Sequence, residues 1–250
     1  MSGHSKWATI KHKKGAADKA RGKLFAKLIR QVEVAAREGG GDPEANPTLR
    51  TMFQKARESS VPLDTIERAI KRGTGELEGV TYETVSYEGY APAGVAIIVE
   101  CLTDNRNRTA ADVRSTFSKN GGSMAEPGAV AWQFERRGVV LVPAAAASED
   151  DLMLVALEAG ADDIVDAGGT WQVTTPPSEL PAVQAALEAA GITVESAEVT
   201  MLPSQTVPLS SETDARKVLR LVDLLEDNDD VQNVYANFDI PDAILELVEA

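Results

Sequence analysis

The fold is decided by residues 139–201, which read VVLVPAAAASEDDLMLVALEAGADDIVDAGGTWQVTTPPSELPAVQAALEAAGITVESAEVTM. Short runs that predict strands lie at 139–143, 163–166, 170–175 and 193–201. Segments that predict helices lie at 149–159 and 179–190. The resulting order, β-α-β-β-α-β, is that of the ferredoxin-like split βαβ unit. We therefore predict a complete ferredoxin-like domain at residues 136–203.

The strands and helices predicted on either side of this unit do not make a complete domain on either side alone. On the N-terminal side, strands are predicted at 82–90, 94–103 and 129–134, with a helix at 107–120. On the C-terminal side, only a helix at 213–225 and a strand at 231–238 remain. Because so short a segment buries too little core alone, we predict that residues 79–135 and 204–250 form one α+β domain with the ferredoxin-like domain inserted. The alternative is that residues 206–250 form an independent appendage.

Residues 17–78 predict a helical domain. A helix begins near Asp18, and its apolar face consists of Leu24, Leu28, Val32 and Ala35. Asn46-Pro47 predicts the N-cap and first position of a second helix, and Gly73 predicts the end of a third. The predicted fold class is therefore α+β: an N-terminal three-helix domain followed by two α+β domains, one ferredoxin-like and inserted into the other.

Positive charge is concentrated at the start of the chain. The first thirty residues hold nine lysines and arginines against Asp18 alone, a net charge of +8. The whole chain carries −14, so the other 220 residues carry −22. This separation predicts that the N-terminal end contacts a polyanion, while the acidic remainder is repelled by it.

Residues 1–16 show no periodicity and predict a basic flexible tail. Its lysines would attract phosphates in a salt-dependent manner, and Trp7 could stack on an unpaired base. The basic face continues along the first helix. The candidate nucleic-acid-binding residues at this end are Lys6, Trp7, Lys11, His12, Lys13, Lys14, Lys19, Arg21, Lys23, Lys27 and Arg30. The alternative is a solvated arm that aids solubility, with Trp7 folded back onto the helices.

A second candidate contact is Thr103–Thr109, which joins the end of a buried strand to the start of a helix. Helix N-termini favour anions, and Arg106 and Arg108 add guanidinium groups in a domain poor in cations. The alternative is structural: Asp104, Asn105 or Asn107 caps the helix, and the arginines pair with nearby acids.

Other chemistries find little support in the sequence. His4, His12 and Cys101 do not form a metal-binding pattern, and no nucleophile has a recognisable catalytic setting, so we expect no metal, no cofactor and no enzyme activity. The acidic run at 226–230 lacks calcium-loop spacing and predicts a solvated turn. No apolar run is long enough to span a membrane, and a single cysteine suits the reducing cytoplasm. The charge of −14 favours a monomer.

Several stretches together resemble the YebC/PmpR family along essentially the whole chain. They are Met1–Trp7, Ile10–Lys14, Gly40–Pro43, Asn46-Pro47, Tyr87–Pro92, Thr103–Thr109 and Asn120–Gly122. The resemblance implies a helical N-terminal domain and two α+β domains, one inserted in the other. It also implies a probable transcriptional regulator that binds DNA. Related members, including a mitochondrial activator of cytochrome oxidase translation, act on ribosomes.

Three hypotheses for the function follow. The first is a DNA-binding regulator that grips duplex with its helical domain, although the sequence shows no compact helix-turn-helix with a basic recognition helix. The second is a ribosome-associated translation factor that inserts its basic tail into ribosomal RNA while the acidic body stays outside. The third is a protein-interaction module that acts through the acidic ferredoxin-like domain.

Overall fold

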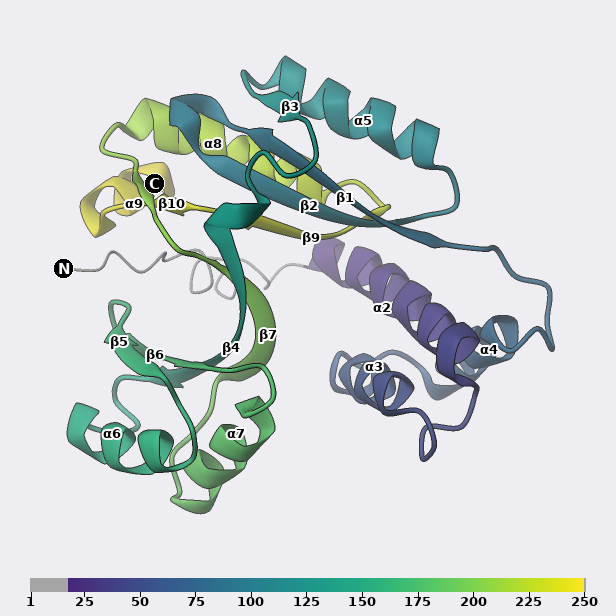
Figure 1. Ribbon diagram of the computed structural model, residues 1–250, viewed down its shortest axis with the longest axis horizontal. Helices are drawn as coiled ribbons and strands as arrows, with labels where there is room; N and C mark the ends of the chain where they lie inside the picture. The colour runs from purple at the N-terminus through teal and green to yellow at the C-terminus, as the bar shows by residue number, and fades with distance from the viewer. Residues whose placement is uncertain (1–17, 250) are drawn as a thin grey trace.

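The structure, a computed structural model, describes residues 18–249 and places them in three lobes (Figure 1). The first lobe is helical and comprises α2 (Asp18–Gly39), α3 (Pro47–Glu58) and α4 (Leu63–Gly73). Leu28, Val32, Leu49 and Ile66 are at the centre of its apolar core. The predicted three-helix domain is confirmed, and α2 is its longest element.

Local sequence signals explain how these helices begin and pack. Asn46 caps α3, since its side-chain oxygen accepts the Leu49 N–H at 3.0 Å, and Pro47 occupies the first turn. At the other end of the lobe, Gly73 allows α4 to approach α2 closely. A Cβ atom at Gly73 would lie 2.4 Å from the carbonyl oxygen of Glu33, so a larger residue would push the two helices apart.

The second lobe is built on a four-stranded antiparallel sheet of order β3-β1-β2-β9. Its strands are β1 (Glu83–Tyr90), β2 (Ala96–Thr103), β3 (Ser123–Ala125) and β9 (Val231–Ala236). Two helices, α5 (Arg106–Lys119) and α8 (Glu212–Glu226), pack on one face of this sheet (Figure 1). Because β9 pairs with β2, the C-terminal segment completes this sheet and is not an independent appendage.

Three further elements belong to this lobe. The short strands β8 (Val207–Pro208) and β10 (Phe238–Asp239) pair in parallel, and α9 (Asp242–Glu249) packs on α8. The sequence patterns did not predict α9.

The second face of the same sheet is covered by a loop where a strand was predicted. The predicted strand at 129–134 is wrong: residues 131–133 form a 3₁₀ turn, η2, and Phe134 instead begins β4 (Phe134–Pro143). Glu88, on β1, accepts N–H bonds from Gly128, Val130 and Ala131 at 2.7, 2.7 and 2.8 Å. Three backbone donors of this loop are therefore satisfied by one carboxylate instead of a strand partner.

The third lobe has the predicted ferredoxin-like order. Its elements are β4, α6 (Glu149–Glu158), β5 (Asp163–Asp166), β6 (Thr170–Thr175), α7 (Leu180–Ala189) and β7 (Ser196–Pro203). The sheet order is β5-β6-β4-β7, and all neighbours are antiparallel. Both strands that connect this lobe to the second one, β4 and β7, belong to a single ladder (Figure 1). The domain boundaries at 136 and 203 stay predictions.

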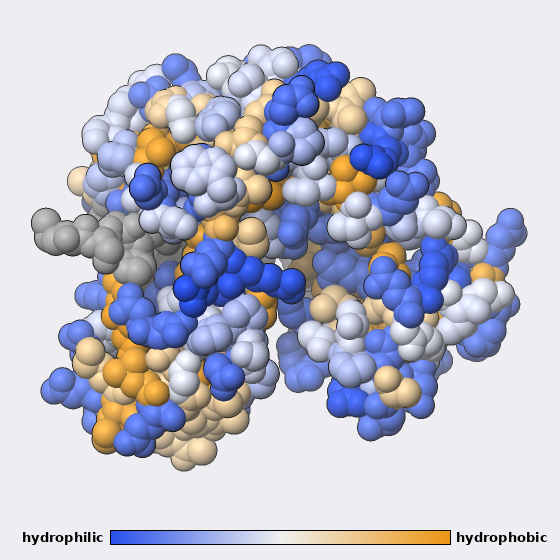
Figure 2. Space-filling model, in the orientation of Figure 1, coloured by the Kyte–Doolittle hydropathy of each residue, from blue (hydrophilic) through white to orange (hydrophobic). Residues whose placement is uncertain are grey.

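One helix of the third lobe carries apolar side chains on its outer surface. In α6, Leu152 and Ala156 are buried in the core, whereas Met153, Leu154 and Leu157 are 43%, 65% and 44% exposed. Figure 2 shows hydrophobic surface gathered over this lobe. Carboxylates flank the exposed apolar residues in the helix, at Asp150 and Glu158.

Candidate nucleic-acid interface

The basic side of α2 faces the second lobe of the same chain. Since Leu28 and Val32 point into the helical core, Lys23, Lys27 and Arg30 are directed away from it. These three cations contact the end of α8 and the loop that follows, residues 226–230, which we call the acidic loop. The predicted basic face therefore exists, and the chain itself occupies part of it.

The two lysines bind the C-terminal end of α8. Lys23 Nζ lies 2.7 Å from Asp227 Oδ1 and 3.0 Å from the Asp227 carbonyl oxygen. Lys27 Nζ donates to the Glu226 carbonyl oxygen at 3.0 Å. The last carbonyl groups of a helix have no partner within the helix, and they form the negative end of its dipole. Two ammonium groups are therefore stabilised at this position.

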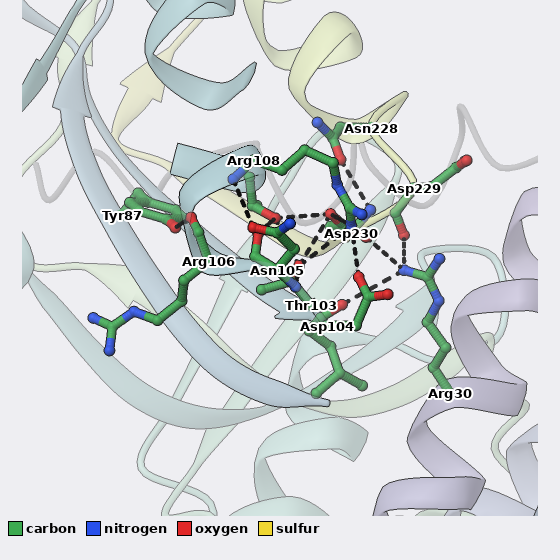
Figure 3. Close-up of polar contacts among 12 residues, drawn as sticks. Arg30, Tyr87, Thr103, Asp104, Asn105, Arg106, Arg108, Asn228, Asp229 and Asp230 are labelled. Carbon is green, nitrogen blue, oxygen red and sulfur yellow. Dashed lines mark hydrogen bonds and ion pairs between the residues drawn. The ribbon is translucent and has the colours of Figure 1, made fainter. Parts of the chain in front are cut away.

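Arg30 reaches deeper into the acidic loop. Its guanidinium donates to the Asp229 carbonyl oxygen at 2.6 Å and to Asp230 Oδ1 at 3.1 Å (Figure 3). On its other side it lies over the ring of Tyr82, 5.5 Å from the ring centroid, as in a cation–π pair. The three cations of α2 thus share one acidic partner.

Asp230 is the centre of the polar cluster at this junction. Its side chain is only 7% exposed, and it accepts bonds from Arg108 Nη2 at 2.7 Å, Thr109 Oγ1 at 2.7 Å and Thr103 Oγ1 at 3.2 Å. Burial alone would raise the pKa of Asp230. These hydrogen bonds and the Arg108 charge outweigh burial, so the pKa of Asp230 lies below its usual value.

The two arginines predicted as a second contact have different environments. Arg108 pairs with Asp230 and with Asp104, 2.8 Å away, and the hydrogen bonds that its guanidinium donates to these carboxylates raise its pKa. The side chain of Arg106 is exposed and points away from this cluster (Figure 3). Asn105 caps α5 by accepting the Arg108 N–H at 3.1 Å. The structural alternative thus describes Arg108, and Arg106 is the one directed to solvent.

The remaining candidates lie at the N-terminal end. Lys6, Trp7, Lys11, His12, Lys13 and Lys14 are outside the described residues. Lys19 and Arg21 belong to the first turns of α2, but their side chains are outside the described part. Their role in binding stays a prediction.

The prediction of a solvated turn at 226–230 is only partly right: residues 227–230 form a turn with Asp227 and Asp229 exposed, but Asp230 is buried and the loop contacts three cations of α2. Charge complementarity between a basic helix and an acidic run was a usable signal. It was not specific, since the chain has 39 carboxylate residues and the pattern does not say which of them meets Arg30.

Hollows flank the contact between α2 and the acidic loop. One, of about 620 Å³, is lined by Arg30, Tyr82, Asp104, Arg108 and Asp112 together with the acidic loop. A second, also of about 620 Å³, is lined by Lys23, Lys27 and Lys55 opposite Glu198 and Asp223. The first is lined almost wholly by charged and polar side chains, which suits solvated ionic partners better than an apolar ligand, whereas Leu24 and Leu28 add apolar surface to the second.

The single cysteine and the metal-ligating side chains among the described residues are not arranged for chemistry. Burial raises the pKa of the Cys101 thiol to about 12, so it is protonated and a poor nucleophile at neutral pH. Within residues 18–249, no group of three His, Cys, Asp or Glu side chains is arranged to hold a metal ion. None of the described helices is both long and apolar enough to cross a membrane.

Comparison with known proteins gives matches along nearly the whole chain. Residues 5–76 match the N-terminal domain of TACO1/YebC proteins, and residues 82–238 match their second and third domains. A protein of Thermobifida fusca (strain YX), named a probable transcriptional regulatory protein, is 60% identical over 246 residues, 98% of each chain. A protein of Mycobacterium sp. (strain KMS) with the same name is 56% identical over 250 residues, the full length of both.

A solved structure agrees with these matches. The crystal structure of a conserved hypothetical protein from Aquifex aeolicus superposes with a TM-score of 0.82 at 49% identity, covering 95% of this chain and 98% of that one. The family matches, the full-length relatives and the shared fold lead to one conclusion: the chain belongs to the TACO1/YebC family.

Proposed function

We propose that this protein is a non-enzymatic regulator of gene expression that binds nucleic acid through its basic N-terminal end. The observation that carries the proposal is the separation of charge, +8 in the first thirty residues against −22 in the rest. Such a distribution brings one end to a phosphate backbone and keeps the body away from it. Relatives named probable transcriptional regulatory proteins support a regulatory role.

DNA is the target that the names of the relatives favour. In this form of the proposal, Lys11, Lys13 and Lys14 contact phosphates, and Arg106 adds a separate exposed cation. Arg108 is less suited to this role, because Asp104 and Asp230 already bind its guanidinium.

Ribosomal RNA is the alternative target, and one structural observation favours it. The basic side of α2 lies against the acidic loop, so a straight duplex laid along α2 would meet Asp227 and Asp229. A narrow tail inserted between RNA strands would avoid this repulsion, because the acidic body would remain outside.

The test is the salt dependence of binding. Replacing Lys11, Lys13 and Lys14 together by Ala removes three phosphate contacts, so the slope of log K against log salt for a DNA duplex should fall by about 3. The matched control replaces Arg136, Lys217 and Arg220, three exposed cations of the other two lobes, and should leave most of that slope. An unchanged slope in the tail variant contradicts the proposal.

The same pair of variants identifies the target. Each is sedimented with ribosomes from a lysate at two salt concentrations, and each is tested for a mobility shift of promoter DNA. If wild type and control travel with ribosomes while the tail variant does not, ribosomal RNA is the target. If only the DNA shift depends on the tail, the transcriptional role holds.

A further inference from the structure

The helical lobe is joined to the second lobe by a small polar contact. The helical core draws all its residues from α2, α3, α4 and the loops between them. The buried core residues of the second lobe lie at position 91 and beyond, so no apolar cluster formed by residues 18–249 crosses the junction. The contacts described above are ion pairs and hydrogen bonds, together with one between Gln31 and Gln232 at 3.1 Å. A junction that has polar contacts but no shared apolar core is weak.

The covalent link between the two lobes also permits movement. Residues 74–82, between α4 and β1, contain no helix or strand, and residues 74–81 are exposed throughout. Arg37 donates to the Val80 carbonyl oxygen at 2.9 Å, and Arg30 covers Tyr82. Rotation about this segment would separate α2 from the acidic loop and leave both cores intact.

The acidic loop offers α2 the same chemistry as a phosphate backbone. Its oxygen atoms lie 2.6–3.1 Å from the three cations, two of them carboxylate oxygens and three of them carbonyl oxygens. Phosphate oxygens bind ammonium and guanidinium groups at the same distances. One set of cations therefore has two competing classes of partner, one inside the chain and one outside it.

We propose that the acidic loop is an internal competitor that holds α2 in a closed form, and that a nucleic-acid phosphate backbone displaces it from Lys23, Lys27 and Arg30. The inference rests on the proposed function, because it concerns how that nucleic acid gains access to α2. Binding then requires the open form, so the apparent affinity is reduced by the fraction of molecules that are closed. A substitution that removes a contact of the closed form should therefore strengthen nucleic-acid binding.

The arrangement of Asp230 makes this exchange reversible. When Arg30 leaves, Asp230 keeps its bonds to Arg108, Thr109 and Thr103. The opening of the junction therefore leaves no buried charge without a partner. The side chains of Lys23 and Asp227 are already 42% and 68% exposed, so they return to water at little cost. The competitor is thus bound by contacts that are individually weak and separately replaceable.

Asp227→Asn tests the competition directly. It removes the carboxylate that binds Lys23 but leaves the polar cluster of Asp230 in place. Because an exposed ion pair contributes about 0.2–1 kcal/mol, we expect roughly two- to fivefold tighter binding of a short DNA duplex or RNA. Asp112→Asn is the matched control: it removes the same charge from the rim of the same hollow, from a residue of α5 that lies outside the contact with α2. Equal effects of the two variants would overturn the proposal, since general repulsion would then explain both.

A distance measurement tests the opening itself. Spin labels on Glu67→Cys in α4 and Ala111→Cys in α5 report the separation of the two lobes, and both sites are exposed. The native Cys101 is 1% exposed and does not compete for the label. A short DNA duplex, or in a second arm a short RNA, should shift the distance distribution away from the closed value in full-length protein. In the absence of nucleic acid, Asp227→Asn should broaden the distance distribution between the two labels.

The outcomes separate the two proposals. Binding with an unchanged distance overturns the competition but leaves the proposed function standing. Failure of both the duplex and the RNA to bind overturns the proposed function and the inference with it. Binding with a shifted distance, and a larger gain for Asp227→Asn than for Asp112→Asn, supports both.

Discussion

Asp230 shows how a single side chain can serve two lobes. It joins the end of β2, the start of α5 and the basic side of α2 through Thr103, Arg108 and Arg30. Carboxylates with several charged and hydroxyl donors stay ionised even when they are buried. Most of these partners lie in the second lobe. Asp230 therefore matters more for the stability of the second lobe than for the position of the helical lobe.

Asp230→Asn tests this dependence. The amide keeps the shape but loses charge-assisted bonds, so the free energy of unfolding should fall by about 1–3 kcal/mol at neutral pH, measured by urea denaturation. The native pKa of Asp230 is lowered, so its contribution is present above the ordinary pKa of about 3.9 and is lost as the pH falls through the native value. The difference between wild type and variant should therefore narrow on acidification. A difference independent of pH would assign the effect to shape alone.

At the scale of elements, the loop at 126–133 covers a sheet face without being a strand. Glu88 holds it with three backbone bonds, and Val130 contributes a buried side chain to the cluster with Ala96 and Ile98. Burial would raise the pKa of Glu88, but the N–H groups of Gly128, Val130 and Ala131 outweigh it and the pKa is lowered. The loop thus has a defined conformation, and the indole of Trp132 on it is 71% exposed.

Glu88→Ala should release this loop. Three backbone N–H groups lose their acceptor, so we expect a loss of about 3 kcal/mol in the free energy of unfolding. Hydrogen exchange at Gly128, Val130 and Ala131 should quicken, while amides of β6 in the third lobe stay protected. Glu83→Ala, at the exposed start of the same strand, is the control and should change neither quantity. Unchanged exchange in Glu88→Ala would mean that packing of Val130 holds the loop.

At the scale of the whole molecule, the three lobes have separate cores. The core of the third lobe draws its residues from between Val140 and Val199. Two apolar residues of the ladder reach beyond it: Phe134 and Met201 pack with Tyr235 against the second lobe. The third lobe is therefore self-contained in its packing.

The fragment 136–203 should fold alone. Its core is complete without the rest of the chain, so it should unfold in one cooperative transition, followed by circular dichroism during heating. Leu152→Ala removes a fully buried side chain and should lower the midpoint of that transition. A fragment with no cooperative transition, or one unaffected by Leu152→Ala, would contradict the predicted domain boundary.

Local signals in the sequence predicted what short-range physics determines. Asn46-Pro47 begins α3 as expected, and the β-α-β-β-α-β order appears in the third lobe. The predictions failed where a partner lies far along the chain. Residues 129–134 were predicted to be a strand from their apolar character, but the N–H groups of Val130 and Ala131 bond to Glu88, about 40 positions earlier.

The candidate site shows the same limit. Arg108 meets Asp230 at a separation of 122 residues, and Lys23 meets Asp227 at 204. The distribution of charge along the sequence predicted that the basic N-terminal end would bind a negatively charged partner. It did not predict that the nearest negative charge would belong to the same chain.

The two attachments of the second lobe differ in stiffness. The inserted lobe is held by β4 and β7, which pair continuously from Phe134–Pro203 to Leu141–Ser196, so neither strand can bend or slide without breaking hydrogen bonds of the other. The helical lobe is held covalently by one segment, residues 74–82, and otherwise by the polar contacts of α2 with the acidic loop. A force on the outer surface of α6 would therefore act through a rigid lever arm and turn the second lobe as a whole. The same force on α3 would first change the conformation of the connecting segment, residues 74–82, before it moved the second lobe.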